Sequence, residues 1–375
     1  MTSNSNADPV VSIVVPTFRE VENLPLLIAR VSAAMTAAGH TSYEMIVVDD
    51  NSQDGTEEAI SKAAAEGRPV RVITRTEERG LSSAVIRGFT EARGDILICM
   101  DADLSHPPEA LPQLVETIRG NPTVDFVIGS RYVPGAGTDQ SWGLFRWLNS
   151  KVATLMARPF TSAKDPMAGF FALPRKVFAR ADHLNPIGYK IGLELIVKCG
   201  CGDVREIPIY FADRQFGESK LSLKEQIRYI KHLKRLADYK YGSFSQLAQF
   251  CLVGSTGVVV DLAALALLLR AALPFEIARA IAILVAMTWN FWLNRRLTFS
   301  YSRRGGLIGQ YFRFVATCSV GGIVSYAISV GLKSWVEFFH IHVFLAALIG
   351  IIVGTLFNFL ISRYWVFKRQ AEKPN

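Results

Sequence analysis

Two aspartates separated by one residue follow an apolar run in the first third of the chain. Residues 96–100 are Ile, Leu, Ile, Cys and Met, which is typical of a buried parallel strand, and Asp101 and Asp103 come directly after it. In open α/β sheets, ligands bind outside the carboxyl ends of the strands. Mg²⁺ and Mn²⁺ prefer oxygen ligands and keep substrate phosphates in their coordination shell. The pattern therefore predicts a metal–diphosphate site, although a solvated turn with a helix cap has the same spacing.

Charged residues also follow four other runs that have the composition of strands. These runs are 12–16, 44–50, 70–75 and 125–131, and helical patterns of 10–15 residues separate most of them, so we predict a doubly wound parallel α/β sheet. Each charge alone could be a helix-end acid or a solvated surface group, but together they predict one site. The acids suit a ribose or a metal and the bases suit phosphates: Glu20, Asp49, Asp50, Arg75, Arg79 and Arg131. Neither a GxGxxG nor a P-loop motif occurs, which disfavours a dinucleotide or P-loop enzyme.

The last third of the chain is largely apolar. It contains four long apolar segments, each of about the length that crosses ~30 Å of hydrocarbon, at 246–269, 277–294, 312–332 and 343–362. Lys and Arg concentrate before the first segment, between the second and third, and after the fourth, so the positive-inside rule predicts four spans with both ends in the cytosol. Four such runs in succession disfavour the alternative of buried core helices. The first residues lack the features of a signal peptide, so we expect the first domain to be cytosolic.

The net charge of +8 arises largely from the segments that flank these spans. Anionic lipid headgroups are the simplest partner for it, and no basic stripe in the first half indicates nucleic acid. Residues 221–240 carry apolar side chains at helical spacing on one side and Lys and Arg on much of the rest. This predicts a helix lying on the membrane, with an ordinary packed surface helix as the alternative. The five cysteines lack zinc-ligand or CxxC spacing, so we expect them to be reduced.

The apolar third contains a weak internal repeat. Residues 249–262 resemble 313–326, and residues 290–299 resemble 358–367. The matches align Gly257 with Gly321 and Asn290 with Asn358. We therefore predict a duplicated pair of spans, as in many membrane carriers. Asp261 is the only acid within a predicted span, which makes it a candidate functional residue or a charge paired near the membrane face.

Seven motifs in order carry a resemblance to a known family. They are PTFREVENL, VVDDNSQDGT, GLSSAVIRGF, DADLSHPPE, GSRYVPG, DPMAGFFAL and GESKLS, all within residues 10–225. The series resembles the dolichol-phosphate mannose synthases, which are family-2 glycosyltransferases of the GT-A fold. Residues 246–367 resemble the GtrA-like family of four-span membrane proteins. The resemblance implies a disordered N-terminus (1–9), a GT-A domain (10–220), amphipathic interfacial helices (221–245), a membrane domain (246–367) and a cytosolic tail (368–375).

The same resemblance implies roles for individual residues. The nucleotide sugar would be bound by Pro16, Phe18, Glu20, Asp50, Arg79, Asp101, Ala102 and Asp103. The metal would be held by Asp101, Asp103 and Ser105, and the acceptor phosphate by Arg131, Lys164, Arg214, Ser219 and Lys220. Asp103, Arg131, Arg214 and Lys220 would be catalytic. Ser105 replaces a common Gln, Lys164 a common Arg and Ala168 a common Ser, so the geometry around the acceptor phosphate departs from the family pattern.

The activity implied by the resemblance is inverting transfer of mannose from GDP-mannose to a polyprenyl or dolichyl phosphate at the cytosolic membrane face, with Mg²⁺ or Mn²⁺. A phosphate with a second pKa of about 6 is largely dianionic at neutral pH, so this nucleophile needs no general base. Transfer from UDP-glucose or another UDP-sugar, and a flippase role for the membrane half, remain alternatives. A processive polysaccharide synthase is disfavoured, because the nearest match to its QxxRW motif, at residues 310–314, lies far from the catalytic half. The sequence leaves open whether copies of the chain associate.

Overall fold

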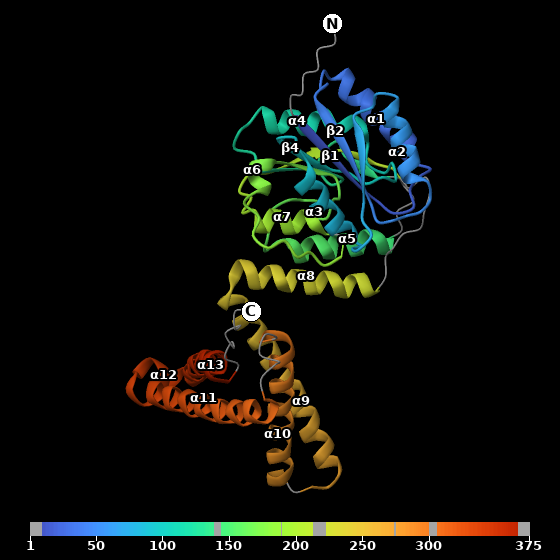
Figure 1. Ribbon diagram of the computed structural model, residues 1–375. Coiled ribbons are helices and arrows are strands. Elements are labelled where there is room, and N and C mark those ends of the chain that lie inside the picture. The colour runs from blue at the N-terminus through green and yellow to red at the C-terminus, as the bar shows by residue number, and fades with distance from the viewer. Residues whose placement is uncertain are drawn as a thin grey trace. The chain divides into compact units, whose positions relative to one another are not determined.

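The structure is a computed structural model, and it describes residues 10–138, 144–188, 190–212, 223–273, 275–299 and 306–366. The chain divides into two compact units, Met1–Lys240 and Tyr241–Asn375 (Figure 1). The first contains the strands, and the second consists of helices.

A twisted sheet forms the centre of the first unit, with the strand order β3-β2-β1-β4-β7-β5-β8 among the described residues. β1, β2, β3 and β4 pair in parallel, β7 is antiparallel to both β4 and β5, and β8 pairs in parallel with β5. β6 (Gly137–Thr138) and β9 (Tyr210–Phe211) form a separate parallel pair. The strands of the main sheet are β1 (Val11–Thr17), β2 (Tyr43–Asp49), β3 (Val70–Thr74), β4 (Ile96–Cys99), β5 (Phe126–Ser130), β7 (Phe171–Pro174) and β8 (Val204–Pro208).

The five predicted strands are confirmed as β1 to β5 and run parallel to one another, but the sheet also contains β7, a strand that the sequence did not predict and that is antiparallel to its neighbours. The chain enters β7 through the loop that begins at Asp165, and β7 then runs against its neighbours, with Phe171 opposite Cys99 and Ile128. β7 has only four residues, all buried. So short an apolar run gives no periodicity from which its direction could be predicted.

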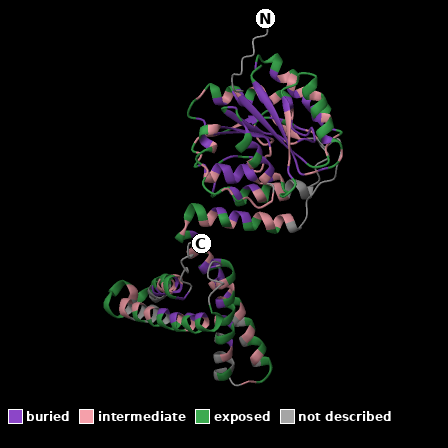
Figure 2. Cartoon of the chain, viewed as in Figure 1, coloured by how far each residue is buried: buried purple, intermediate pink, exposed green. Residues whose placement is uncertain are grey.

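Helices cover both faces of the sheet, and successive strand residues face opposite sides, so there are two cores (Figure 2). Ile13 and Val15 pack with α1 and α4, whereas Val14 packs with α3 on the other face. The helices of this unit are α1 (Leu24–Ala37), α2 (Thr56–Ala65), α3 (Leu81–Glu91), α4 (Leu111–Arg119), α5 (Leu144–Ala157), α6 (Arg175–Phe178), α7 (Ile191–Lys198) and α8 (Leu223–Tyr241), with a 3₁₀ turn at Pro108–Ala110.

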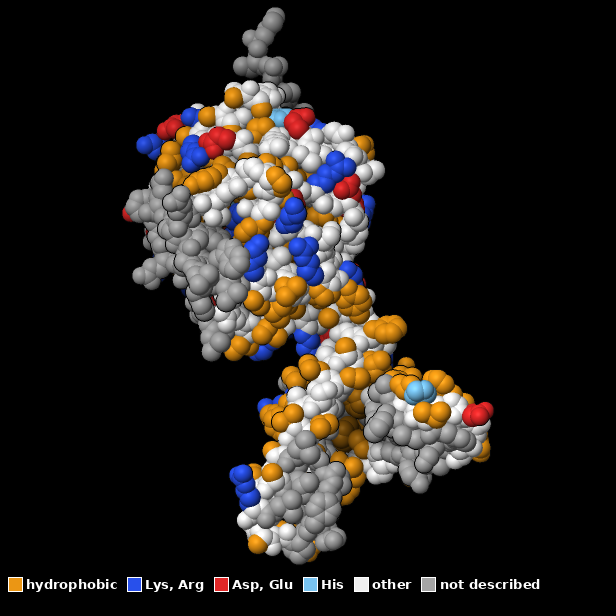
Figure 3. Space-filling model, turned by 180° about the vertical axis from the view of Figure 1, so that it is seen from behind, with side chains coloured by type: hydrophobic (Ala, Val, Ile, Leu, Met, Phe, Trp, Pro, Cys, Tyr) orange, Lys and Arg blue, Asp and Glu red, His pale blue; other side chains and the backbone are white. Residues whose placement is uncertain are grey.

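α8 uses part of its apolar side to pack on the first unit. Leu233 and Leu236 are buried with Ala157 of α5, and the Tyr229 hydroxyl donates to the carbonyl of Ala153 at 2.7 Å. The predicted apolar stripe is therefore divided, because its other members, such as Ile230 with 54% exposure, remain on the surface. Figure 3 shows hydrophobic side chains along the end of the unit where α8 lies, with Lys and Arg side chains nearby.

The second unit consists of long helices over the four predicted spans. They are α9 (Ser243–Arg270), α10 (Phe275–Leu293), α11 (Leu307–Trp335) and α13 (Val343–Ile361), with the short α12 (Glu337–Ile341) before the last. Among the residues that the structure describes, Ser243–Val260 is the one stretch both long and apolar enough to cross a membrane. The number of four spans therefore stays a prediction.

The two hairpins of this unit repeat each other in detail. A Cβ atom at Gly257 would lie 2.3 Å from Oδ1 of Asn290. A Cβ atom at Gly321 would overlap with the side-chain amide of Asn358. Both hairpins then end in a π-helical turn, at Asn294–Thr298 and Ser362–Val366. The sequence repeat therefore corresponds to a structural one, in which each glycine accommodates the asparagine of the neighbouring helix.

Candidate active site

The site lies where the strand order reverses, between β1 and β4, outside the carboxyl ends of both strands. Here several residues in the loops have a left-handed backbone conformation although they are not glycine. That conformation costs free energy for any residue with a Cβ atom. Arg19 (φ 61°) follows β1, Asn51 (φ 55°) and Gln53 (φ 53°) follow β2, and Leu104 (φ 61°) follows β4. Three neighbouring strands thus end in strained turns at one edge, as is common at functional sites.

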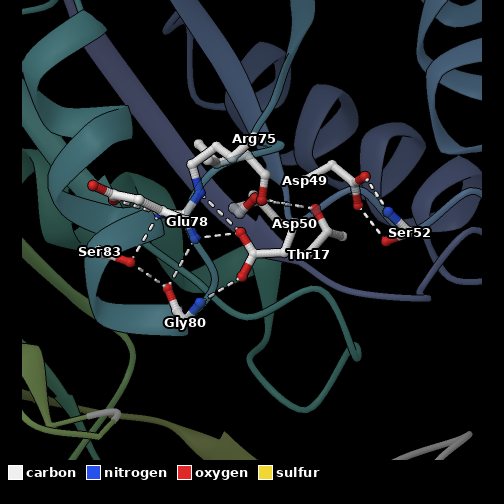
Figure 4. A network of polar contacts seen from close by, with 10 residues as sticks. Thr17, Asp49, Asp50, Ser52, Arg75, Glu78, Gly80 and Ser83 are labelled. Atoms are coloured by element: carbon white, nitrogen blue, oxygen red, sulfur yellow. Dashed lines mark hydrogen bonds and ion pairs between the residues drawn. The ribbon is translucent and has the colours of Figure 1, made fainter.

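Asp49 is the last residue of β2 and Asp50 follows it, and their carboxylates hold two loops in place (Figure 4). The Asp50 carboxylate accepts hydrogen bonds from Nε of Arg75 at 2.8 Å and from the backbone N of Gly80 at 2.7 Å. Asp49 accepts from the backbone N of Ser52 at 2.8 Å. Because the Asp50 and Arg75 side chains are 10% and 7% exposed, their pairing anchors the loop between β3 and α3.

The other residues expected around the nucleotide differ in exposure. Phe18 is 40% exposed, and the guanidinium carbon of Arg79 lies 5.5 Å from its ring centre, so the two form a cation–π pair at the surface. Oε2 of Glu20 accepts from the amide of Asn23 at 2.6 Å. Pro16 is buried within β1 and does not present its ring to the surface. Phe18, Glu20 and Arg79 are therefore the residues here whose side chains are at least partly exposed.

Asp101 and Asp103 lie in the loop after β4. Oδ1 of Asp103 accepts hydrogen bonds from the backbone N of Ser105 at 3.1 Å and from its hydroxyl at 2.5 Å. The backbone N of Asp101 donates to Nδ1 of His106 at 3.1 Å. These bonds fix the turn, so the two carboxylates have defined positions. Ala102, expected among the nucleotide-sugar contacts, is buried at 3% exposure.

Gly169 faces the carboxylate of Asp101 from the loop before β7. A Cβ atom at Gly169 would lie 3.2 and 3.3 Å from the two carboxylate oxygens, which is closer than nearly all real Cβ contacts. A larger residue here would displace Asp101. The glycine therefore leaves the space that this carboxylate needs.

Arg131, at the end of β5, forms a buried ion pair with Asp165. Its Nε and Nη2 donate to the carboxylate at 2.7 and 2.8 Å, and the two side chains are 14% and 1% exposed. Burial lowers the pKa of Arg131, but the hydrogen bond and charge of Asp165 outweigh it and raise the pKa above its usual value. The guanidinium also lies 5.2 Å from the ring centre of Phe211. Arg131 is therefore a fixed, permanently charged cation.

Of the other residues predicted to contact the acceptor phosphate, the structure describes only Lys164. The side chain of Lys164 is exposed. The backbone N of Lys164 donates a hydrogen bond to Oε2 of Glu206 at 2.8 Å. Arg214, Ser219 and Lys220 lie outside the described residues.

Sequence reasoning missed two residues of the site. His106 is 3% exposed, and its ring stacks on Phe170 with 5.2 Å between centres. Its place in the DADLSHPP motif was a signal that could have found it. Lys190 lies at the start of α7 and interacts electrostatically with Arg131, Asp165 and Asp101. A lone lysine before an apolar helix gives no such signal, because it is more often a solvated charge.

Comparison with known proteins places both halves of the chain. Residues 12–181 match the model of glycosyl transferase family 2, and residues 249–372 match that of the GtrA/DPMS transmembrane domain. A dolichol-phosphate mannosyltransferase of Pyrococcus furiosus is 39% identical over 94% of this chain and 98% of its own length. One of Mycosarcoma maydis is 46% identical over 64% of this chain and 83% of its own. Among solved structures, glucosyl-3-phosphoglycerate synthase from Mycobacterium tuberculosis aligns with 62% of this chain and 80% of its own, at 19% identity and a TM-score of 0.46. The chain belongs to the family-2 glycosyltransferases that carry a GtrA/DPMS transmembrane domain, the family of the dolichol-phosphate mannosyltransferases.

Proposed function

We propose that the chain transfers mannose from GDP-mannose to the phosphate of a polyprenyl or dolichyl phosphate, with inversion, at the cytosolic face of a membrane. The observation that carries the proposal is the placement of Asp101 and Asp103 at the switch point of the sheet, where Asp101 interacts electrostatically with Arg131 of the Arg131–Asp165 pair. Acids for a metal and a fixed cation for a phosphate thus meet at one edge. The names of the relatives support mannose and a polyprenyl phosphate.

The residues present fit a divalent metal. Among the described residues no three His, Cys, Asp or Glu side chains form a metal cluster. The loop after β4 offers two carboxylates and the hydroxyl of Ser105. This is a donor set that suits Mg²⁺ or Mn²⁺, which bind through one or two carboxylates and take further ligands from substrate phosphates. Asp101 and Asp103 would hold the ion, with Ser105 bonded to Asp103. A bound ion there would neutralise the charge of the departing diphosphate.

The acceptor needs orientation more than activation. A phosphate monoester is already a dianion at neutral pH, so no side chain has to remove a proton from it. The obstacle is repulsion between the two anionic substrates, and Arg131 offsets it with a charge that Asp165 holds in place. The acceptor oxygen attacks C1 of the sugar as the bond to the diphosphate breaks. A single displacement of this kind inverts the anomeric centre.

The surface of the first unit suits delivery of a lipid acceptor. α8 leads directly into α9, and it exposes Ile227 and Ile230 on a helix rich in Lys and Arg. The neighbouring α5 exposes Val152 and Leu155, the latter at 70%. Exposed apolar side chains beside basic ones fit the headgroup region of an anionic membrane. We propose that α8 lies at this depth, so that the lipid phosphate reaches the site without leaving the bilayer.

A panel of labelled sugar nucleotides, incubated with the full chain and polyprenyl phosphate, tests the proposal. We expect a mannosyl lipid from GDP-mannose and little product from UDP-glucose. Product from UDP-sugars alone would overturn the mannose assignment and leave the reaction type standing. A second function, translocation of the product by the membrane half, is tested by following access of labelled product to the lumen of proteoliposomes that contain Asp103→Asn.

A further inference from the structure

A lysine that the mechanism above does not use lies next to the Arg131–Asp165 pair. Lys190 is the N-cap residue of α7. Two residues further on, a Cβ atom at Gly192 would lie 3.4 Å from the carbonyl oxygen of Ala168, whose own backbone N donates to Asp165 at 3.2 Å. The start of α7 thus packs on the loop that positions the partner of Arg131.

The other side of this segment is held by α3 and α8. The hydroxyl of Ser82 in α3 donates to the carbonyl of Gly188 at 2.8 Å. A Cβ atom at Gly188 would lie 3.3 Å from Oε2 of Glu225, which is in the first turn of α8. The backbone around Lys190 therefore lies between the proposed membrane helix and the site. A movement of α8 would therefore change the position of Lys190.

The electrostatic surroundings of Lys190 agree with the placement given by these backbone contacts. Its pKa is lowered to about 8, first by burial and then by the charge of Arg131, while Asp165, Asp101 and Glu225 oppose the shift. The lysine thus shares one neighbourhood with the fixed cation and with the first proposed metal ligand. Two cations so close together repel each other, and a dianionic phosphate between them relieves that repulsion.

We propose that Lys190 binds the phosphate of the lipid acceptor together with Arg131, and that Glu225 is a positioning residue that ties Lys190 to α8. The proposal rests on the transfer to a polyprenyl phosphate proposed above. It replaces Lys164, whose side chain is exposed, as the lysine that meets the acceptor.

Binding of farnesyl phosphate to the full chain in detergent, measured by calorimetry, tests the role of Lys190 without turnover. We expect Lys190→Gln to weaken binding about tenfold or more, the usual loss for a hydrogen bond to a charged group. Binding of GDP-mannose should stay within about twofold, since the loss is confined to one ligand, and Lys190→Arg should recover part of the affinity because it keeps the charge. Lys176→Gln, an exposed lysine on α6, is the matched control. Unchanged farnesyl phosphate binding in Lys190→Gln, or equal weakening of both ligands, would overturn the proposal.

Kinetics separate this proposal from the proposed function. If the wild-type chain transfers no sugar but Lys190→Gln still loses farnesyl phosphate binding, the transfer proposal fails and the phosphate site stands. For Glu225→Gln we expect a raised KM for the acceptor with kcat and donor KM little changed, and recovery in Glu225→Asp. If Glu225→Gln lowers thermal stability and leaves the acceptor KM unchanged, Glu225 is a structural residue only.

Discussion

The carboxylate of Asp165 accepts three hydrogen bonds from Arg131, two from the guanidinium and one from the backbone N at 3.0 Å. The backbone N of Asp165 in turn donates to Glu206 of β8 at 2.9 Å. Three segments far apart in the sequence, around residues 131, 165 and 206, are thus joined at the end of β5. The pair therefore fixes both the position of the cation and the entry into β7.

Asp165→Asn should destabilise the first unit, because it leaves the buried guanidinium without a counter-charge. Loss of one partner of a buried pair costs about 3–5 kcal/mol. We expect a clear fall in the thermal unfolding temperature of the catalytic unit and a fall in turnover. The matched control is Asp203→Asn, because Asp203 pairs with Arg205 at the surface. Equal stability of the two variants would show that the Arg131–Asp165 pair is not needed for the fold.

Gly169→Ala should lower activity while leaving the fold intact. The added methyl group would approach both carboxylate oxygens of Asp101 within 3.3 Å, so the carboxylate must move by a few tenths of an ångström. We expect kcat/KM to fall roughly tenfold, because small misplacements of catalytic groups are costly. Gly202→Ala is the control, since its added methyl group would make an ordinary 3.7 Å contact with Asp125. Wild-type kinetics in Gly169→Ala would mean that the position of Asp101 is unimportant.

Asp103→Asn tests the proposed metal site. The amide keeps an oxygen that can accept from Ser105, so the turn should persist, but it holds a divalent cation poorly. We expect turnover to fall roughly a hundredfold or more, with partial recovery at high Mg²⁺ or Mn²⁺, and chelation to abolish wild-type activity. A variant as active as wild type at limiting metal would show that the site is misassigned.

The parts of the fold that could be predicted are those whose signals are local. β1 to β5 are apolar runs bounded by turn residues, and the acids at their ends follow directly from chain direction. β7 could not be placed, because its antiparallel pairing with β4 and β5 depends on segments about 40 to 80 residues away. The sequence also could not show which apolar residues of α8 are buried and which stay exposed, since burial of Leu233 depends on contact with α5 and α7.

The candidate site shows the same limit. The sequence indicates Asp101 and Asp103 because two acids at a strand end form a pattern. It gives no sign that Asp50 is paired with Arg75, or that Lys190 lies beside Arg131, because such pairs form only when distant loops fold together. Resemblance to a family suggested residue roles, and these stay predictions; nothing in the sequence indicated that the side chains of Pro16 and Ala102 are buried.

The repeated glycine–asparagine contacts should stabilise the membrane half. Gly257→Ala should lower its unfolding temperature in detergent, because the added methyl group would lie 2.3 Å from the side chain of Asn290. Adding Asn290→Ala should recover much of the loss, since the obstructing amide is removed. Gly254→Ala, three residues earlier on α9 and with nothing within 4 Å, is the control and should be neutral or slightly stabilising. If the Gly254 and Gly257 variants behave alike, the contact does not contribute to stability.

Truncation after Gly242 should separate anchoring from catalysis. The shortened chain keeps both cores of the first unit and all of α8, whose Leu233 and Leu236 pack on that unit. It should therefore fold and transfer sugar to a short, detergent-soluble acceptor within about tenfold of the full chain, a loss of no more than ~1.4 kcal/mol in transition-state stabilisation. Transfer to long polyprenyl phosphate in bilayers should fall much further, because the enzyme no longer shares the membrane with its acceptor. A folded truncation that binds GDP-mannose but is inactive on the short acceptor would mean that residues beyond 242 take part in the reaction itself.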